Sequence, residues 1–337
     1  MSSATTSRPD EARPRDAAPP EAAIEAAAVA PEVAAPGLAP SRAAIWGALA
    51  IVYVVWGSTY LAIRVVVKEM PPITSAGLRF ITASLLVGAY VALRHGPGTL
   101  RVRPRELGSA AIVGVLLLLG GNGLVSLGER TVPSGLTALL VAATPLSIVI
   151  LRRISGDRPR LMTWAGVLVG IAGLVVLVAP GISGGSTAGT ILIVVATLSW
   201  ALGSFASPRL AMPSNPSVAT AWEMLAGGLA MLIVGLARGE RFDFSFGYSG
   251  KSIFALAYLV VFGSIVAFSA YVWLLSKAPI SLVATYAYVN PIVAVILGAL
   301  LLSESVTAVI VIGGAIVVAG VALVVGAERP RSSPAEQ

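Results

Sequence analysis

Two charged residues, Arg79 and Glu223, stand inside long apolar runs of this 337-residue sequence. A charge at the centre of a membrane-spanning helix costs about 2.5–3.5 kcal/mol, so such residues usually face a bundle interior or a wet cavity. At helical spacing Arg79 shares a face with Ser75 and Thr82, and Glu223 shares one with Thr220. We expect both side chains to point inward, where the two charges could pair. A structural ion pair and a role in ligand binding fit the sequence equally well. Burial also favours the neutral carboxylic acid, which makes Glu223 the predicted proton-coupling residue.

Aromatic and amide side chains mark the same apolar runs. Trp56 and Tyr60 lie four residues apart, and Trp56 is about twelve residues into its run, too deep for an interfacial belt. Aromatic rings at this depth could line a cavity for an amphipathic solute through stacking and cation–π contacts. Asn122 fits a cavity wall or an interhelical hydrogen bond equally well. The predicted cavity residues are Trp56, Tyr60, Arg79, Asn122, Trp222, Glu223, Tyr286, Tyr288 and Asn290.

Two prolines, Pro145 and Pro291, fall inside apolar runs. Proline removes a backbone donor and kinks a helix, so these residues are predicted gating positions. A static kink tolerated by its neighbours is an equal alternative.

Charges at the ends of the runs have simpler interpretations. We expect Arg64, Glu129 and Arg130 to be solvated rim residues. Asp157 and Glu304 precede the last apolar run of each half, where a carboxylate would stabilise the helix N-terminus that follows.

The composition indicates what kind of protein must position these charged and aromatic residues. Hydrophobic residues make up 56% of the chain and charged residues only 12%, and the mean hydropathy is +0.88. Soluble domains are about 25% charged, so the composition predicts a polytopic membrane protein. The net charge of +7 is spread over short links, which argues against a nucleic-acid partner. With no cysteine and His95 as the one histidine, we expect no metal site and no cofactor.

Ten apolar runs are long enough to span a membrane as helices. We therefore predict an all-α protein with ten transmembrane helices. Residues 1–43 are rich in Ala, Pro, Glu and Arg, which predicts a disordered tail, and a second tail covers 327–337. The predicted spans are 44–64, 73–93, 108–128, 133–151, 161–180, 188–207, 217–236, 252–274, 280–302 and 307–326.

Positive residues in the links predict the orientation. If the N-terminus is cytoplasmic, the inner links hold thirteen Lys or Arg residues and the outer links hold six. Both termini are therefore predicted to be cytoplasmic.

An internal repeat divides the chain into 44–180 and 188–326. Pro133 and Pro279 are 146 residues apart, as are Pro145 and Pro291; Asp157 and Glu304 are 147 apart. Gly166 and Gly313, and Gly173 and Gly320, share the separation of 147. Five spans per repeat force the second copy to enter the membrane from the opposite side, and inverted repeats place a binding site between them near mid-membrane.

The segments "YVVWGSTYLAIRVV", "PPITSAGLRF", "GNGLVSLGERTVPSGLTALLVAATPL" and "ATYAYVNPIVAVILG" closely resemble the EamA branch of the drug/metabolite transporter superfamily. The likeness is to bacterial inner-membrane drug/metabolite exporters and covers about residues 44 to 326. It implies two inverted five-helix EamA repeats, cytoplasmic termini and a central cavity that opens to alternate sides. Asp157 stands where the family usually has Glu, as at Glu304.

The sequence raises three candidate functions. A secondary transporter that exports small metabolites, amino-acid-like solutes or drugs agrees with the repeat and the resemblance. An intramembrane lipid-modifying enzyme would need a His, Cys, metal or paired carboxylates within reach. A channel would need a ring of charges or carbonyls. Neither pattern is visible. The substrate, the direction of transport, the coupling ion and the oligomeric state are not predicted.

Overall fold

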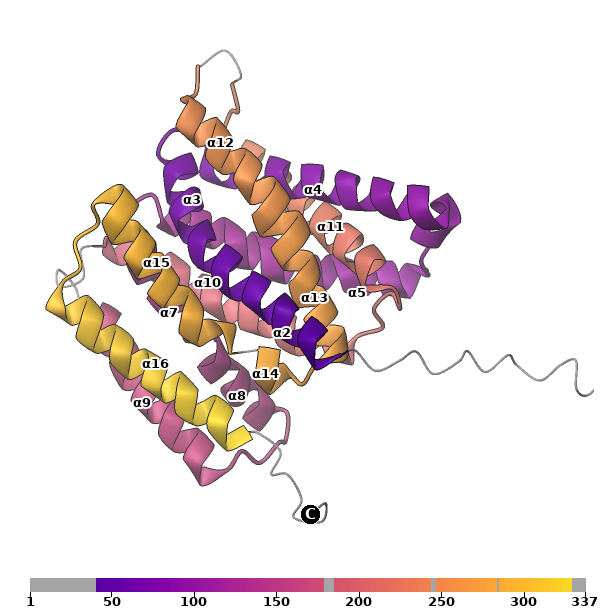
Figure 1. The fold of residues 1–337 in the computed structure, drawn as a ribbon. Coiled ribbons are helices and arrows are strands. Elements are labelled where there is room, and N and C mark those ends of the chain that lie inside the picture. The colour runs from indigo at the N-terminus through magenta and orange to yellow at the C-terminus, as the bar shows by residue number, and fades with distance from the viewer. Residues whose placement is uncertain (1–40, 179–184, 244–246, 284, 329–337) are drawn as a thin grey trace, which may run out of the picture. The chain divides into compact units, whose positions relative to one another are not determined.

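The computed structural model describes residues 41–178, 185–243, 247–283 and 285–328 (Figure 1). Over these ranges the chain is helical and contains no strand. Seven of the described helices are long and apolar enough to cross a membrane, and three shorter apolar helices cover Leu161–Leu177, Val289–Leu302 and Ala308–Val324. Each of the ten predicted spans corresponds to one of these helices. The prediction of an all-α membrane protein with ten transmembrane helices is confirmed. The predicted tails lie almost wholly outside the described residues.

The first repeat supplies spans 1 to 5. In chain order its helices are α2 (Arg42–Ile51), η1 (Val52–Trp56), α3 (Gly57–Val67), α4 (Pro72–His95), η2 (Pro97–Leu100), α5 (Pro104–Gly114), η3 (Val115–Gly123), α6 (Leu124–Gly128), α7 (Ser134–Val141), α8 (Thr144–Ile154) and α9 (Leu161–Val178).

The second repeat supplies spans 6 to 10. Its helices are α10 (Thr187–Ala206), η4 (Ser207–Arg209), α11 (Pro216–Ala237), α12 (Gly250–Tyr258), η6 (Leu259–Val266), α13 (Ala267–Lys277), α14 (Ile280–Val283), α15 (Tyr286–Leu302) and α16 (Ala308–Glu328). Proline is the first residue of α4, α5 and α11. It is favoured there because the first helical N–H has no partner within the helix.

Three spans contain wide, π-helical turns. These are η1 in span 1, η3 in span 3 and η6 in span 8. A π-helical turn shifts the side chains that follow it relative to a regular helix and often occurs at functional sites.

The two predicted kink prolines sit in different local structures. Span 4 divides into α7 and α8, and Pro145 is the second residue of α8, where the missing N–H costs little. Pro291 lies inside the continuous helix α15. The division of span 9 into α14 and α15 falls upstream of that proline. The repeated prolines therefore do not mark equivalent breaks.

Corresponding helices of the two halves pack against each other: α4 against α11, and α9 against α16 (Figure 1). Glycines allow the backbones of α9 and α16 to touch. A Cβ on Gly166 would lie 2.8 Å from the carbonyl oxygen of Gly320, and one on Gly173 would lie 2.9 Å from that of Gly313. The residue numbers rise on one helix as they fall on the other, so the two helices are antiparallel. This is the packing expected of inverted repeats.

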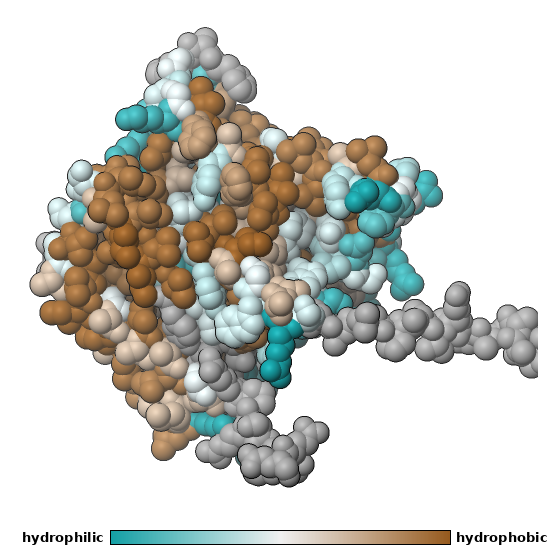
Figure 2. Space-filling view, in the orientation of Figure 1, coloured by the Kyte–Doolittle hydropathy of each residue, from teal (hydrophilic) through white to brown (hydrophobic). Residues whose placement is uncertain are grey.

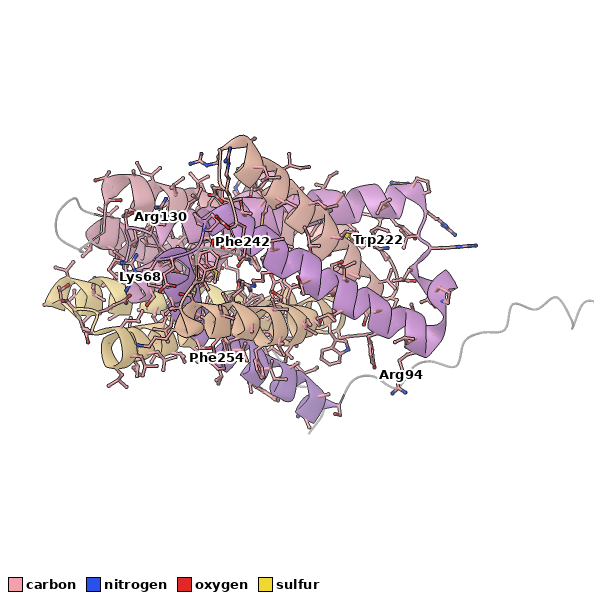
Figure 3. All side chains as sticks on the ribbon, turned by 90° about the horizontal axis from the view of Figure 1, so that it is seen from above. Lys68, Arg94, Arg130, Trp222, Phe242 and Phe254 are labelled. Carbon is pink, nitrogen blue, oxygen red and sulfur yellow. The ribbon has the colours of Figure 1, made fainter. Side chains whose placement is uncertain are left out.

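The outer surface carries many large apolar side chains. Figure 2 shows a continuous hydrophobic area over α15 and α16, and large exposed side chains include Leu93, Leu161, Phe254 and Leu300. Exposed apolar area of this extent marks contact with lipid. Charged side chains gather at the ends: Lys68 and Arg130 lie toward one end and Arg94 at the other (Figure 3).

Candidate functional site

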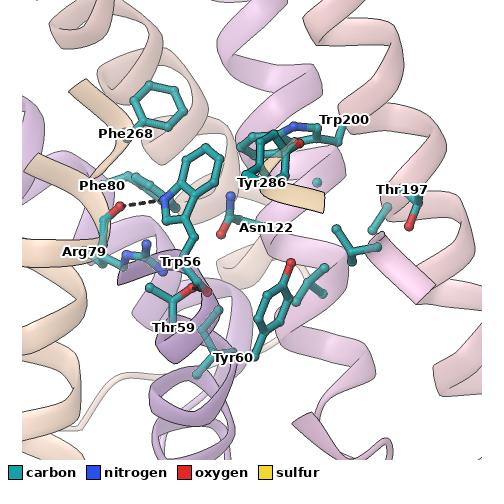
Figure 4. A pocket seen from close by; sticks show the side chains of 16 residues that line it. Trp56, Thr59, Tyr60, Arg79, Phe80, Asn122, Thr197, Trp200, Phe268 and Tyr286 are labelled. Carbon is teal, nitrogen blue, oxygen red and sulfur yellow. Dashed lines mark hydrogen bonds between the residues drawn. The ribbon is translucent and has the colours of Figure 1, made fainter. Parts of the chain in front are cut away.

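A chamber lies between the two repeats, and both contribute to its wall (Figure 4). Its volume is about 60 Å³, enough for a few water molecules. Binding sites for drug-sized ligands are several times larger, so a solute of that size needs the chamber to widen. The lining residues are Trp56, Thr59, Tyr60, Ile63, Arg79, Phe80, Gly121, Asn122, Val125 and Val141 from the first repeat, and Ala196, Thr197, Trp200, Gly263, Phe268 and Tyr286 from the second.

The chamber wall uses all three π-helical segments. Trp56 ends η1, Asn122 belongs to η3, and Gly263 belongs to η6. The indole N–H of Trp56 donates to the carbonyl oxygen of Gly263 at 3.3 Å (Figure 4). This bond joins span 1 to span 8 at the chamber wall and fixes the orientation of the indole ring.

Four rings form an aromatic cluster beside the chamber: Trp56, Trp200, Tyr271 and Tyr286. The ring centre of Trp56 lies 5.5 Å from that of Trp200, 4.8 Å from that of Tyr271 and 5.5 Å from that of Tyr286. Tyr271 and Tyr286 also line a smaller cavity next to Pro145. The cluster therefore separates the chamber from this second cavity.

Arg79 is the charged residue of the chamber wall. Its side chain is only 4% exposed, and its Nε donates to the hydroxyl of Ser264 at 2.7 Å. The guanidinium carbon lies 4.4 Å from the ring centre of Phe80, a cation–π contact. Of the predicted polar stripe, Ser75 is buried whereas Thr82 is exposed.

The predicted ion pair between Arg79 and Glu223 is wrong. In the described part of the chain, the ion pair within 4.0 Å joins Arg152 and Asp157. Arg79 and Glu223 each lie about two turns into their own helix, but α4 and α11 are antiparallel, and Gly77 packs against Gly228. The two charges therefore lie at different depths.

The level of Glu223 on α4 is marked by Ser84. The Ser84 hydroxyl donates to the carbonyl oxygen of Ala221 at 2.7 Å, two residues before Glu223. Ser84 follows Arg79 by five residues, about 7.5 Å along the helix axis.

Glu223 lines a separate cavity of about 140 Å³ together with Leu117, Ser207, Met212 and Ser276. Its side chain is 1% exposed, and its Oε2 atom has no hydrogen-bond partner. Such a carboxylate suits proton binding, because an unpaired charge is costly at this burial. Its coupling role remains a prediction.

The other predicted cavity residues divide between the chamber and its surroundings. Tyr60, Asn122 and Tyr286 line the chamber with Trp56 and Arg79. Trp222 lies outside the chamber: it lines a groove beside α4, and its indole N–H donates to the carbonyl oxygen of Leu100 at 3.1 Å. The prediction grouped Trp222 with the aromatic residues that could line a cavity, and the structure does not place it in the chamber wall.

Asn290 is buried and does not line the chamber. In the orientation that satisfies both amide atoms, its nitrogen donates to the carbonyl oxygens of Tyr53, at 3.0 Å, and Tyr286, at 3.2 Å. The geometry fits a side chain that joins span 9 to span 1. The side chain of Tyr288 lies outside the described residues.

The expectation that Glu129 is solvated is wrong. Glu129 is fully buried, and both its carboxylate oxygens lack hydrogen-bond partners. Arg64 is half-buried, and its Nη1 donates to the backbone carbonyl of Glu129. Arg130, in contrast, is exposed as expected.

The two acidic turn residues do not stabilise the helices that follow them. Glu304 accepts hydrogen bonds at the N-terminus of α7, from the Ser134 backbone N–H at 2.9 Å, the Ser134 hydroxyl at 2.8 Å and the Gly135 N–H at 3.2 Å. Asp157 instead pairs with Arg152 in its own link at 2.9 Å. Glu304 binds a helix N-terminus as predicted, but that helix, α7, belongs to the other repeat.

Sequence reasoning missed Trp200 and Tyr271 as members of the aromatic cluster. Trp200 opens the segment "WALGSFASPR", which resembles the "VVWGSTYLAIR" segment that contains Trp56, so a signal for it exists. The Tyr271 hydroxyl lies 2.9 Å from the hydroxyl of Ser204. Nothing in the sequence around Tyr271 indicates this contact, because it joins spans 6 and 8.

Ten helices in two inverted repeats around a chamber with one buried cation define a polytopic membrane protein of the transporter type. The sequence profile of the EamA-like transporter family matches residues 42–179 and again residues 187–326. The chain belongs to this family. This confirms the resemblance that the sequence segments suggested.

Known relatives agree with this assignment. The uncharacterized inner membrane transporter YedA of Escherichia coli K12 is 41% identical over 255 residues, which cover 75% of this chain and 81% of YedA. The chloroplastic WAT1-related protein At3g02690 of Arabidopsis thaliana is 24% identical over 291 residues, covering 83% of this chain and 69% of that protein. A crystal structure, described only as that of a protein, aligns with a TM-score of 0.62 at 22% identity over 84% of this chain and 96% of that one. This last similarity concerns the fold alone.

Proposed function

We propose that this protein is a secondary transporter that exports small amphipathic metabolites or drugs by alternating access across the chamber. We place it in a bacterial inner membrane with both termini in the cytoplasm, as the distribution of Lys and Arg over the links indicates.

The chamber between the repeats is the observation that carries this proposal. Its wall combines aromatic rings with polar groups from both repeats, the mixture that an amphipathic solute needs. Inverted repeats allow one half to rock against the other around such a site. In the structure the chamber is too small for a drug-sized solute, which agrees with a transport cycle in which it widens.

Individual residues take distinct roles in this proposal. Trp56, Tyr60, Arg79, Asn122 and Tyr286 contact the solute. Glu223, in its separate cavity, carries the coupling proton, and the divided span around Pro145 and the helix with Pro291 move as the chamber opens. Asn290 fits a joint between spans 1 and 9, and Trp222 lies outside the chamber. A contact between Tyr288 and the solute stays a prediction.

Solute counterflow in liposomes with the purified full-length protein tests the proposal. Saturable exchange of a labelled solute is the expected result. Turnover of lipid without solute exchange would favour the alternative, an intramembrane lipid-modifying enzyme. Glu223→Gln should abolish accumulation driven by a pH gradient and preserve exchange, because only net transport requires the proton. Unchanged accumulation would remove Glu223 from the mechanism.

A further inference from the structure

The charge of the chamber wall is unbalanced. Of the residues that line it, Arg79 is charged and none is acidic. Within the described residues no carboxylate oxygen lies within 4.0 Å of the Arg79 nitrogens. Glu223 belongs to another cavity, and Glu129, although buried, does not line the chamber. The chamber is therefore a cationic site inside an apolar bundle.

The hydrogen-bonding capacity of Arg79 is also largely unused. A guanidinium has five N–H donors, and the hydrogen bond that the structure gives it runs from Nε to Ser264. That bond and the contact with Phe80 hold the side chain in place. In Figure 4 the guanidinium lies beside the side chains of Trp56 and Thr59, which also line the chamber. A buried cation with free donors is stabilised by an anion that enters this space.

The rest of the wall restricts the kind of anion. One guanidinium matches the charge and planar shape of one carboxylate, which it binds through two parallel hydrogen bonds. A phosphate dianion would need further cations, and the lining residues supply none. The aromatic cluster suits an aromatic or other apolar group on the same molecule. An ammonium group on that molecule would find no acidic partner in the chamber and would be repelled by Arg79.

We propose that the chamber binds an aromatic monocarboxylate without an ammonium group, with the carboxylate on Arg79 and the ring against the aromatic cluster. This inference rests on the proposed transport function and narrows its substrate class to organic anions, away from amino acids. Ser264 acts as a positioning residue, because it holds Nε and leaves the two Nη groups for the ligand.

Three probes that differ in one group test the inference: phenylacetate, its neutral amide phenylacetamide, and phenylglycine, which adds an ammonium group. Their affinities for the purified full-length protein are measured by tryptophan fluorescence, since Trp56 and Trp200 line the chamber, and by thermal stabilisation. We expect phenylacetate to bind at least about tenfold more tightly than either of the other two. Equal affinities, tighter binding of phenylglycine, or no binding of any probe would overturn the inference.

Substitutions test whether Arg79 causes the preference for phenylacetate. In Arg79→Gln the ratio of phenylacetamide to phenylacetate dissociation constants should fall to about one, while phenylacetamide affinity stays within about twofold. Arg64→Gln is the matched control, since Arg64 does not line the chamber, and should keep the wild-type ratio. If Arg79→Gln does not fold, Ser264→Ala keeps the charge and should reduce the preference about threefold by releasing Nε. If Ser264→Ala keeps the full preference for phenylacetate and Arg64→Gln loses it, the anion binds elsewhere.

The outcomes separate this inference from the transport proposal. Saturable counterflow of a neutral or cationic solute with no phenylacetate binding would refute the anion site and leave the transporter intact. Phenylacetate binding at Arg79 without exchange of any solute would support the site and refute transport.

Discussion

Acidic side chains bond differently at the two ends of the bundle. At one end, Glu69, Glu240 and Glu304 each accept hydrogen bonds at the start of a helix in the opposite repeat. Glu69 binds the backbone N–H of Ser249 at 2.9 Å and its hydroxyl at 2.8 Å, before α12. Glu240 binds the Thr74 N–H at 2.7 Å in the first turn of α4, and Glu304 binds the start of α7. These three cross-repeat caps tie the halves together.

At the opposite end the acidic residues bond within their own links. Glu106 accepts from the Arg103 backbone N–H at 2.9 Å, and Asp157 pairs with Arg152. The bonds between repeats there come from other groups, such as Arg160 to the carbonyl oxygen of Ala327 at 3.2 Å. Asp157 is the repeat counterpart of Glu304, so equivalent positions have different partners at the two ends.

The hydrogen bonds at the two ends differ in strength for a physical reason. A helix N-terminus has free N–H groups and a partial positive charge, so a carboxylate there is held firmly. An exposed ion pair such as Arg152 with Asp157 contributes little. The end with the cross-repeat caps is therefore the more firmly held one, and in the proposed transport cycle these caps must release.

Covalent linkage of a cross-repeat cap should have the largest effect. The chain has no cysteine, so Glu69→Cys with Ser249→Cys creates one defined pair. A bifunctional methanethiosulfonate across this pair should abolish solute exchange in liposomes, and reduction should restore it. The control pair, Arg103→Cys with Glu106→Cys, lies within one link and should leave exchange intact after cross-linking. Exchange that survives linkage of 69 to 249 would show that this end does not open.

Removal of Glu304 should have the next largest effect. Glu304→Ala leaves two N–H groups of α7 and one hydroxyl without their acceptor, so the free energy of unfolding should fall by about 1–2 kcal/mol. Its counterpart Asp157→Ala removes an exposed pair and should change the value by less than about 1 kcal/mol. Chemical unfolding in detergent, followed by tryptophan fluorescence, measures both. Equal losses would contradict the difference between the two ends.

A methyl group beside Glu304 should weaken the same cap less. A Cβ on Gly298 would lie 2.5 Å from Glu304 Oε2 and 3.0 Å from the Ser134 hydroxyl oxygen. Because the carboxylate can move, Gly298→Ala should cost about 1 kcal/mol in the same unfolding assay. Gly326→Ala meets no atom within 4 Å and should be neutral or stabilising, as expected for alanine in a helix. A stabilising Gly298→Ala would mean that Glu304 caps α7 from another position.

The smallest expected effect is on stability at low pH, and it concerns Glu69. Hydrogen bonds from the Ser249 backbone and hydroxyl, followed by one from Ser252, hold the pKa of the Glu69 carboxyl below its usual range. A carboxyl with a lowered folded pKa stabilises the protein above its unfolded pKa, and this contribution disappears as the pH falls through the folded value. Wild-type protein should therefore lose more stability below about pH 4 than Glu69→Gln does. If the melting temperatures of the wild type and of Glu69→Gln fall equally across this pH range, the prediction is wrong.

Hydropathy determined the spans well, because a membrane requires long apolar helices with satisfied backbones. Arg79 and Trp56 were found for the same reason: polar and aromatic residues deep in such spans need a cavity. The failed pairing of Arg79 with Glu223 has a different cause. Periodicity predicts which face of a helix a residue lies on. Its depth relative to a residue on a neighbouring helix depends on the register in which the two helices pack, and local sequence does not give that register.

Glu129 and the caps needed the folded structure for another reason. End-of-span charges are usually solvated, and neither the burial of Glu129 nor the partner of Glu304 follows from local sequence. The π-helical turns were also missed, since hydropathy does not distinguish them from regular helix.

The glycine contact between α9 and α16 has a consequence for the origin of the chain. Gly166 meets Gly320 and Gly173 meets Gly313, while the repeat makes Gly166 the counterpart of Gly313 and Gly173 that of Gly320. Each helix thus presents the same face to the other, which is the symmetry of an isologous dimer. A single five-helix ancestor with this face could have associated with an upside-down copy of itself before gene fusion joined the two.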